Sequence, residues 1–254
     1  MKIVISKTAD ELGMRAAAEA AKHIRAAIER NGCARIALST GASQFETLTH
    51  LVKQDLDWSR VEMFHLDEYV NLSRTHPASF RKYLQERFVA PTGVDKVHFV
   101  DGTPEGIASL TAEIQKAPID VGLIGIGRNA HIAFNDPPAD FDTRASYLVV
   151  NLDEACRKQQ VGEGWFAGIE DVPRQAVSMS VWQIMQCKRI ISAVPHAEKA
   201  WAVAQTLSGE LTPRIPATML KTHDDFQLYV DADSYADVGK IVTLKGTTVC
   251  EDHR

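Results

Sequence analysis

The chain has 254 residues, of which 45% are hydrophobic, 24% are charged and 7% are aromatic. These proportions are typical of a soluble globular protein and exclude fibrous and disordered classes, and a chain of this length can bury a full core without disulfides or a structural metal. Lysines and arginines number 28 against 33 aspartates and glutamates, a net charge of −5, which argues against a general attraction to nucleic acid or to an anionic membrane. An anionic ligand must therefore be held by a local group of donors.

The cysteine pattern indicates reduced thiols. Cys33, Cys156, Cys187 and Cys250 are far apart and form neither a CxxC pair nor the spacing of a zinc site. No segment approaches the roughly 20 apolar residues of a membrane helix, and the apolar run at the N-terminus is too short for a signal peptide. We expect a soluble, cytoplasmic protein.

Strands and helices are predicted to alternate along the chain. Residues 2–5 are expected to form a strand, and residues 8–32 a helix in which Thr8 and Glu11 have capping-box spacing and Gly32 is the stop. The hydrophobic pattern then predicts strands at 34–39, 61–66, 96–100 and 120–127, with helices between them at 44–54, 79–89 and 106–117.

The later part of the chain continues in the same way, with strands predicted at 176–181, 189–194 and 227–231 and a helix at 196–209. This alternation predicts an α/β fold of three αβα layers around a mostly parallel, Rossmann-like open sheet. No linker or repeat divides the sequence, so we expect a single domain over residues 1–254. Ligands of such sheets bind beyond the carboxyl ends of the strands.

The first of these strand ends is a turn of small residues, Ser39–Ser43. Backbone N–H groups and a helix N-terminus suit a phosphate, and Thr40 and Ser43 add hydroxyl donors. The turn lacks the lysine of a Walker A loop and the glycine spacing of a dinucleotide loop, which argues against a nucleotide. The alternative is a tight turn with an N-capping serine.

The second strand end carries Asp67 and Glu68. A carboxylate at this edge can take a proton from a substrate carbon, especially where burial raises its pKa. Adjacent side chains of an extended segment point to opposite faces, so one carboxylate is expected to face the pocket and the other to support the loop. The alternative is a solvated acidic loop or a helix cap.

The third strand end is the segment 125–138, which contains Asn129, His131 and Asp136. Histidine is a suitable acid and base at neutral pH, and its two polar neighbours are close enough to orient its ring. A structural histidine is the alternative. No G-x-S-x-G elbow supports nucleophilic catalysis, and the nine histidines form no H-E-x-x-H or similar metal cluster.

Lys199 lies early in the helix predicted at 196–209. An ammonium group beside a helix N-terminus can complete an anion pocket. The alternative is an ordinary surface lysine.

Together these segments resemble the glucosamine-6-phosphate deaminase family, also called glucosamine-6-phosphate isomerases, which shares its fold with 6-phosphogluconolactonases. The resemblance extends over about residues 35–225 and rests on STGAS (39–43), FHLDEYVNL (64–72), HPASF (76–80), GIGRNAHIAFNDP (125–137), HAEKA (196–200) and PATML (216–220).

This resemblance implies an enzyme that converts glucosamine 6-phosphate and water to fructose 6-phosphate and ammonia without a metal or organic cofactor. Asp67 matches the general base that moves a proton between C2 and C1, and His131 matches the residue that opens the pyranose ring. Asn129 and Asp136 match the positions that orient the histidine. The family holds the phosphate at the positions of Thr40, Gly41, Ser43 and Lys199.

The sequence departs from the family at several of these positions. Ala130 stands where glycine is usual, and Asp136 where the longer glutamate is usual. We expect the shorter carboxylate to reach the histidine only through a water or a shifted loop. Gly164 stands where the family has an arginine that helps bind phosphate, and Arg157 matches an earlier arginine of that stretch.

Loss of a bidentate phosphate ligand predicts weaker anion binding or a different sugar as the substrate. The alternatives are a 6-phosphogluconolactonase-like enzyme, an isomerase of another hexosamine phosphate, and a non-catalytic sugar-phosphate sensor. For each of them the expected partner is a small sugar phosphate, with neither nucleic acid nor membrane involved.

Overall fold

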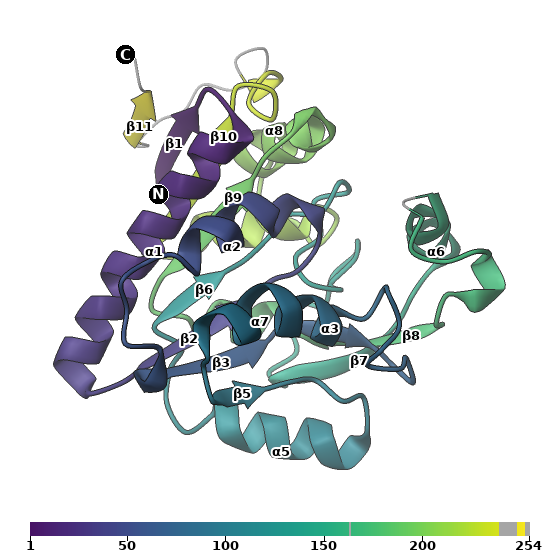
Figure 1. Ribbon diagram of the computed structural model, residues 1–254. Helices are drawn as coiled ribbons and strands as arrows, with labels where there is room; N and C mark the ends of the chain where they lie inside the picture. The colour runs from purple at the N-terminus through teal and green to yellow at the C-terminus, as the bar shows by residue number, and fades with distance from the viewer. Residues whose placement is uncertain (163, 239–247, 252–254) are drawn as a thin grey trace.

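A computed structural model describes residues 1–162, 164–238 and 248–251 of the chain. Its centre is an eight-stranded sheet in the order β11-β1-β10-β9-β6-β2-β3-β5, in which every neighbouring pair is parallel (Figure 1). The strands are β1 (Lys2–Ser6), β2 (Ala34–Leu38), β3 (Val61–His65), β5 (Lys96–His98), β6 (Val121–Leu123), β9 (Ile190–Val194), β10 (Phe226–Asp231) and β11 (Thr248–Glu251). The predicted parallel α/β fold is confirmed.

The predicted helices form as α1 (Ala9–Asn31), α2 (Phe45–Leu51), α3 (Phe80–Leu84), α5 (Pro104–Ile114) and α8 (Ala200–Ser208). The short helices α4 (Ala90–Thr92), α6 (Glu154–Gly162) and α7 (Val181–Ile184) were not predicted. The predicted limits of α1 are confirmed, because Thr8 accepts a hydrogen bond from the backbone N–H of Glu11, and Gly32 ends the helix at a φ of 79°. None of the described helices combines the length and the apolar surface needed to cross a bilayer.

Apolar side chains pack on both faces of the sheet, which gives the three layers. Along β2, Ile36 and Leu38 belong to a core that contains buried residues of α1 and α2. Ala37, between them, belongs to the core formed with α5 and α8 on the other face. Alternate residues of a strand point to opposite faces, so β2 contributes to both cores at once.

A second, antiparallel sheet lies beside the first, in the order β4-β8-β7. It consists of β4 (Asp67–Tyr69), β7 (Tyr147–Asn151) and β8 (Gln175–Met179). The strand predicted at 176–181 therefore forms, but it pairs with this sheet and not with the parallel one. The sequence pattern did not separate β4 from β3, because only Leu66 lies between them.

The order of the parallel strands brings four connections together. β9, β6, β2 and β3 are consecutive neighbours, and parallel strands end at the same edge of a sheet. Four segments must therefore be adjacent at that edge: 195–199, 124–136, 39–43 and the start of β4.

Candidate active site

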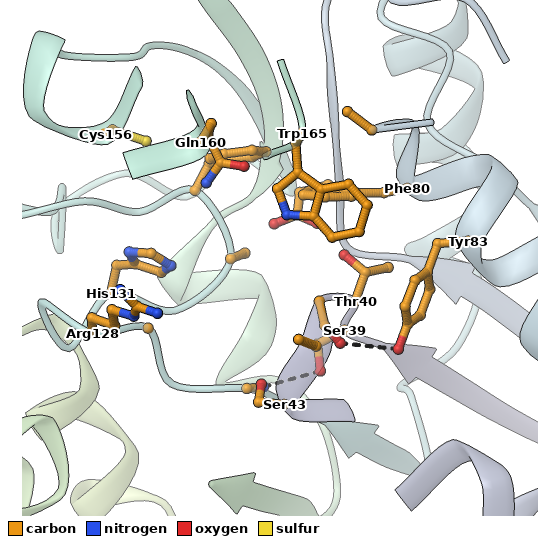
Figure 2. A pocket seen from close by; sticks show the side chains of 18 of the residues that line it. Ser39, Thr40, Ser43, Phe80, Tyr83, Arg128, His131, Cys156, Gln160 and Trp165 are labelled. Carbon is orange, nitrogen blue, oxygen red and sulfur yellow. Dashed lines mark hydrogen bonds between the residues drawn. The ribbon is translucent and has the colours of Figure 1, made fainter. Parts of the chain in front are cut away.

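A cavity of about 320 Å³ opens at this edge (Figure 2). Six of the eight candidate residues line it: Thr40, Gly41, Ser43, Asp67, His131 and Lys199. The other two, Asn129 and Asp136, contact His131 or its loop. The structure thus brings all the candidates together at one place.

The turn after β2 is fixed to the neighbouring strand. The backbone N–H of Ser39 donates to the carbonyl of Leu123 at 2.9 Å, and the Ser39 hydroxyl accepts from Gly125 N–H at 3.1 Å. Gly41 has a φ of 99°, a left-handed conformation that favours glycine. Its carbonyl accepts a hydrogen bond from the Tyr83 hydroxyl at 3.0 Å. The turn is therefore held in one shape beside the cavity.

Asp67 and Glu68 have different surroundings, as the alternation of an extended segment predicts. Asp67 lines the cavity and is 6% exposed. Glu68 is fully buried and accepts hydrogen bonds from the Ser79 hydroxyl at 2.8 Å and from the Arg81 backbone N–H at 2.9 Å. It also forms an ion pair with the Arg81 guanidinium at 3.2 Å. Glu68 therefore anchors the start of α3, while Asp67 faces the cavity.

The charge of Asp67 is not compensated by the described chain. Burial, and then the negative charge of Glu68, raise the pKa of Asp67 from 3.8 to about 8. No donor in the described residues is hydrogen-bonded to its carboxylate. A carboxylate in this setting is a stronger base than an exposed one, because burial favours its protonated form.

His131 is held by its two predicted neighbours. Its Nδ1 lies 3.0 Å from Asp136 Oδ1, and its backbone N–H donates to Asn129 Oδ1 at 3.1 Å. The Asn129 amide in turn donates to Asp136 Oδ1 at 3.0 Å. The distance between His131 and Asp136 is that of an ion pair, although the ring nitrogen is not aligned on the carboxylate as a hydrogen bond requires.

The expectation that Asp136 reaches the histidine through a water is wrong, because its carboxylate lies directly beside the ring; a shift of the loop relative to the family stays a prediction. The segment 129–136 is compact, since Ala130 and Ala133 both have positive φ, 63° and 49°. This conformation brings the shorter carboxylate to the ring directly. Burial alone would raise the pKa of Asp136, but its contacts with His131, Asn129 and Cys156 lower it, so a negative charge is maintained beside the imidazole.

Asn135 and Ser178 position this loop, and sequence reasoning missed both. The Asn135 amide donates to the Ile132 and Met179 carbonyls, each at 2.8 Å, and to the Ser178 hydroxyl at 3.2 Å. The same hydroxyl accepts from Phe134 N–H at 3.0 Å, and Ser178 is paired with Asp67 across the β4–β8 ladder. Strand β8 therefore fixes the distance between the His131 loop and Asp67.

The cavity walls also contain side chains that the sequence did not single out. Figure 2 shows Phe80, Tyr83 and Trp165 on the side opposite His131. Gln160 and Cys156, from α6, also line the cavity, and Gln160 accepts a hydrogen bond from the Tyr69 hydroxyl at 2.8 Å. Helix α6 is short and polar, so its pattern gave no signal of a pocket wall.

Three charged residues lie at the rim where the turn after β2 meets the segment before α8. Lys199, in the short helix η5 (Ala197–Lys199), lines the cavity together with Arg128 and Glu198. Arg128 Nη2 lies 3.4 Å from Glu198 Oε1. Arg157 is not among the lining residues, and its guanidinium donates to the carbonyl of Ile169.

One group of side chains in the described residues has the donors for a metal ion, and it lies outside the cavity. Potential ligand atoms of Glu62, His98 and Glu113 lie within 4.8 Å of one another. Glu62 already contacts Arg35 and His98 at 2.8 Å, and Glu113 contacts Lys116 at 2.6 Å. Cationic side chains therefore already balance these carboxylates.

Comparison with known proteins identifies relatives over most of the chain. The profile of the family described as glucosamine-6-phosphate isomerases/6-phosphogluconolactonase matches residues 7–229. A glucosamine-6-phosphate deaminase of Streptococcus pneumoniae serotype 4 is 35% identical over 211 residues, which cover 80% of this chain and 88% of that protein.

Solved structures give the same result. A monomeric glucosamine-6-phosphate deaminase superimposes with a TM-score of 0.84 and 28% identity, over 93% of this chain and 99% of that one. A 6-phosphogluconolactonase from Shewanella baltica has a TM-score of 0.75 and 17% identity, over 91% and 98% of the two chains. The second similarity shows the shared fold alone.

Proposed function

We propose that this chain, which belongs to the family of glucosamine-6-phosphate isomerases and 6-phosphogluconolactonases, is an amino-sugar-phosphate deaminase. The substrate is glucosamine 6-phosphate, which reacts with water to give fructose 6-phosphate and ammonia. The observation that carries the proposal is that Asp67 and His131 line one cavity whose rim holds the Ser39–Ser43 turn and Lys199. A base, a proton shuttle and a phosphate site are thus within reach of one small sugar.

The first step is opening of the pyranose ring at His131. The imidazole accepts the proton of the C1 hydroxyl and delivers a proton to the ring oxygen as the bond from C1 to that oxygen breaks. Asp136, 3.0 Å from Nδ1, keeps the ring in place and stabilises the positive charge that it carries between the two transfers. The open-chain aldehyde then presents C2 to the base.

The second step is proton transfer by Asp67. Its carboxylate takes the proton from C2 while O1 takes a proton from water, which gives an enolamine across C1 and C2 and a hydroxide. The protonated carboxyl then gives its proton to C1, which leaves an iminium at C2. The hydroxide adds to C2, and its proton passes to the nitrogen, which leaves as ammonia and gives the ketone. The raised pKa of Asp67, about 8, strengthens it as a base, and it reduces the ionised fraction at pH 7 to roughly a tenth.

The phosphate is held at the rim. Backbone N–H groups and hydroxyls of the turn supply donors, and the Lys199 ammonium supplies a positive charge. Because binding at this end fixes C6, C1 and C2 are directed toward His131 and Asp67.

The test is a substrate panel with the purified protein. Glucosamine 6-phosphate, galactosamine 6-phosphate and 6-phosphogluconolactone are incubated in parallel, and ammonia, ketose phosphate and acid release are measured. We expect ammonia and fructose 6-phosphate in equal amounts from the first substrate, and none with Asp67→Asn. Lactone hydrolysis without ammonia would identify a lactonase. Thermal stabilisation by sugar phosphates without turnover of any of them would identify a sensor.

A further inference from the structure

The proposed function places a doubly charged phosphate at a rim where one expected cation is missing. Gly164 occupies the position at which the sequence resemblance calls for an arginine. Arg157 does not replace it, because its side chain is directed to the Ile169 carbonyl and lies outside the cavity lining. With Lys199 alone, one positive side chain would face two negative charges.

Arg128 is the side chain that can supply the second charge. Among the described residues that line the cavity, the lysines and arginines are Arg128 and Lys199. Arg128 follows β6, and β6 lies in the sheet between β2, which leads into the Ser39–Ser43 turn, and β9, which leads to Lys199. The fold therefore places Arg128 between the two segments that hold the phosphate.

The direction of the Arg128 side chain agrees with this placement. Its Nη2 lies 3.4 Å from Glu198, the residue just before Lys199. Figure 2 shows Arg128 beside His131 and facing the cavity, on the side opposite Tyr83. The guanidinium thus lies near the proton shuttle and contacts the residue that precedes Lys199. From there it can reach a group on C6, since C6 is two bonds from the ring oxygen.

We infer that Arg128 is the second cationic ligand of the substrate phosphate, beside Lys199, and that Glu198 competes with the phosphate for it. This inference rests on the proposed function, which places the phosphate at this rim. A guanidinium group can donate two parallel hydrogen bonds to a phosphate, a geometry that an ammonium group lacks. Arg128 would in this way take over the task of the arginine absent from position 164.

The competition follows from the charges. Both side chains of the Arg128–Glu198 pair are 46% exposed, and an ion pair this exposed contributes little to stability, so a phosphate can replace it at little cost. The Glu198 carboxylate also lines the cavity, so it repels a second anion there. Removing its charge should therefore strengthen phosphate binding more than it disturbs Arg128.

The experiment measures the binding of inorganic phosphate to the intact protein by calorimetry, and the KM for glucosamine 6-phosphate. For Arg128→Gln we expect the dissociation constant of phosphate and the KM each to rise by about tenfold. A tenfold change corresponds to the lower end of the strength of a hydrogen bond to a charged group, because Arg128 is about half exposed. For Glu198→Gln we expect a lower phosphate dissociation constant. kcat should change less than KM in both variants.

Arg174 and Glu170 provide the matched control. They form an exposed pair at 3.6 Å, and neither lines the cavity. Arg174→Gln changes the net charge as Arg128→Gln does and should leave phosphate binding unchanged. Equal losses in the two variants, or unchanged phosphate binding in Arg128→Gln, would overturn the inference.

Phosphate binding separates this inference from the proposed function. If the wild-type protein binds inorganic phosphate through Arg128 but releases no ammonia from glucosamine 6-phosphate, the activity is refuted and the role of Arg128 stands. If ammonia is released and KM is unaffected by Arg128→Gln, the activity stands and the role of Arg128 is refuted.

Discussion

Replacing Asp67 with asparagine should abolish turnover and, at neutral pH, make the folded protein more stable. Asparagine has nearly the shape of aspartate but no charge, so it cannot accept the C2 proton. In the folded state the Asp67 carboxylate is 6% exposed and has a pKa of about 8, against 3.8 for the ordinary group. We therefore expect the variant to lose activity, because the base is removed, and to gain stability, because a buried charge that opposes folding is removed.

The size of the effect follows from proton linkage. Between pH 3.8 and 8 the folded state keeps the Asp67 proton while the unfolded state releases it, so stability falls as the pH rises. Each unit of pKa difference corresponds to about 1.4 kcal/mol. The Asp67 carboxyl therefore lowers the free energy of unfolding by about 4 kcal/mol at pH 7 and by roughly 6 kcal/mol above pH 8. Below pH 3.8 the carboxyl is protonated in both states, and the cost disappears.

The assay compares the two proteins by urea unfolding at pH 5 and pH 7. The stability advantage of Asp67→Asn should grow by about 2 to 3 kcal/mol between these values. His65 has the opposite dependence, because burial, and then the charge of Arg81, lower its pKa to about 3. It is present in both proteins, so it cancels in the difference.

Two results would refute this reasoning: an advantage of the same size at both pH values, or a loss of stability at pH 7. The matched control is Asp95→Asn, at an exposed aspartate, which should change the stability by less than about 0.5 kcal/mol. Circular dichroism of the variant excludes a change of fold as the reason for lost turnover.

Further predictions concern activity. Because Asp67 must be ionised, kcat/KM for ammonia release should rise about tenfold per pH unit toward pH 8 and level off above it; a maximum near pH 6 would contradict its role. His131→Gln should cause a severe loss on the cyclic substrate and a milder one on an open-chain analogue, and equal losses would exclude ring opening. A Cβ at Gly127 would overlap the imidazole ring, so Gly127→Ala should lower kcat by about 100-fold with unchanged secondary structure; near-normal kcat would show that the ring position is not critical. Lys199→Ala should raise KM for phosphorylated sugars, and an equal rise for an unphosphorylated analogue would place the lysine in another role.

The sequence predicted the parallel sheet because its strands are continuous apolar runs separated by amphipathic helices. The convergence of Asp67, His131 and Lys199 followed from the same prediction, since the carboxyl ends of parallel strands share one edge. The shared edge did not require the order of the strands. The meeting of the three residues in one cavity does, because β9, β6, β2 and β3 are consecutive neighbours, and the hydrophobic pattern does not contain that order.

Other features depend on contacts that no local pattern records. The strand β4 has three residues and follows β3 after one residue, so the change from one sheet to the other is visible only in its pairing with β8. The direct contact of Asp136 with His131 depends on the positive φ of Ala130 and Ala133, a conformation that is uncommon for alanine. Both features arise from tertiary structure.

The contrast between Asp67 and Glu68 explains why one carboxylate serves the fold and the other is the candidate base. Glu68 is buried, but Arg81 and the donors at the start of α3 balance its charge. Asp67 is buried one residue earlier without such donors in the described chain, and the charge of Glu68 raises its pKa further. A carboxylate that stabilised the fold would be paired, because an unpaired one opposes folding. The rest of the structure must therefore hold Asp67 in place against this cost, which favours a chemical role for the side chain at the cavity.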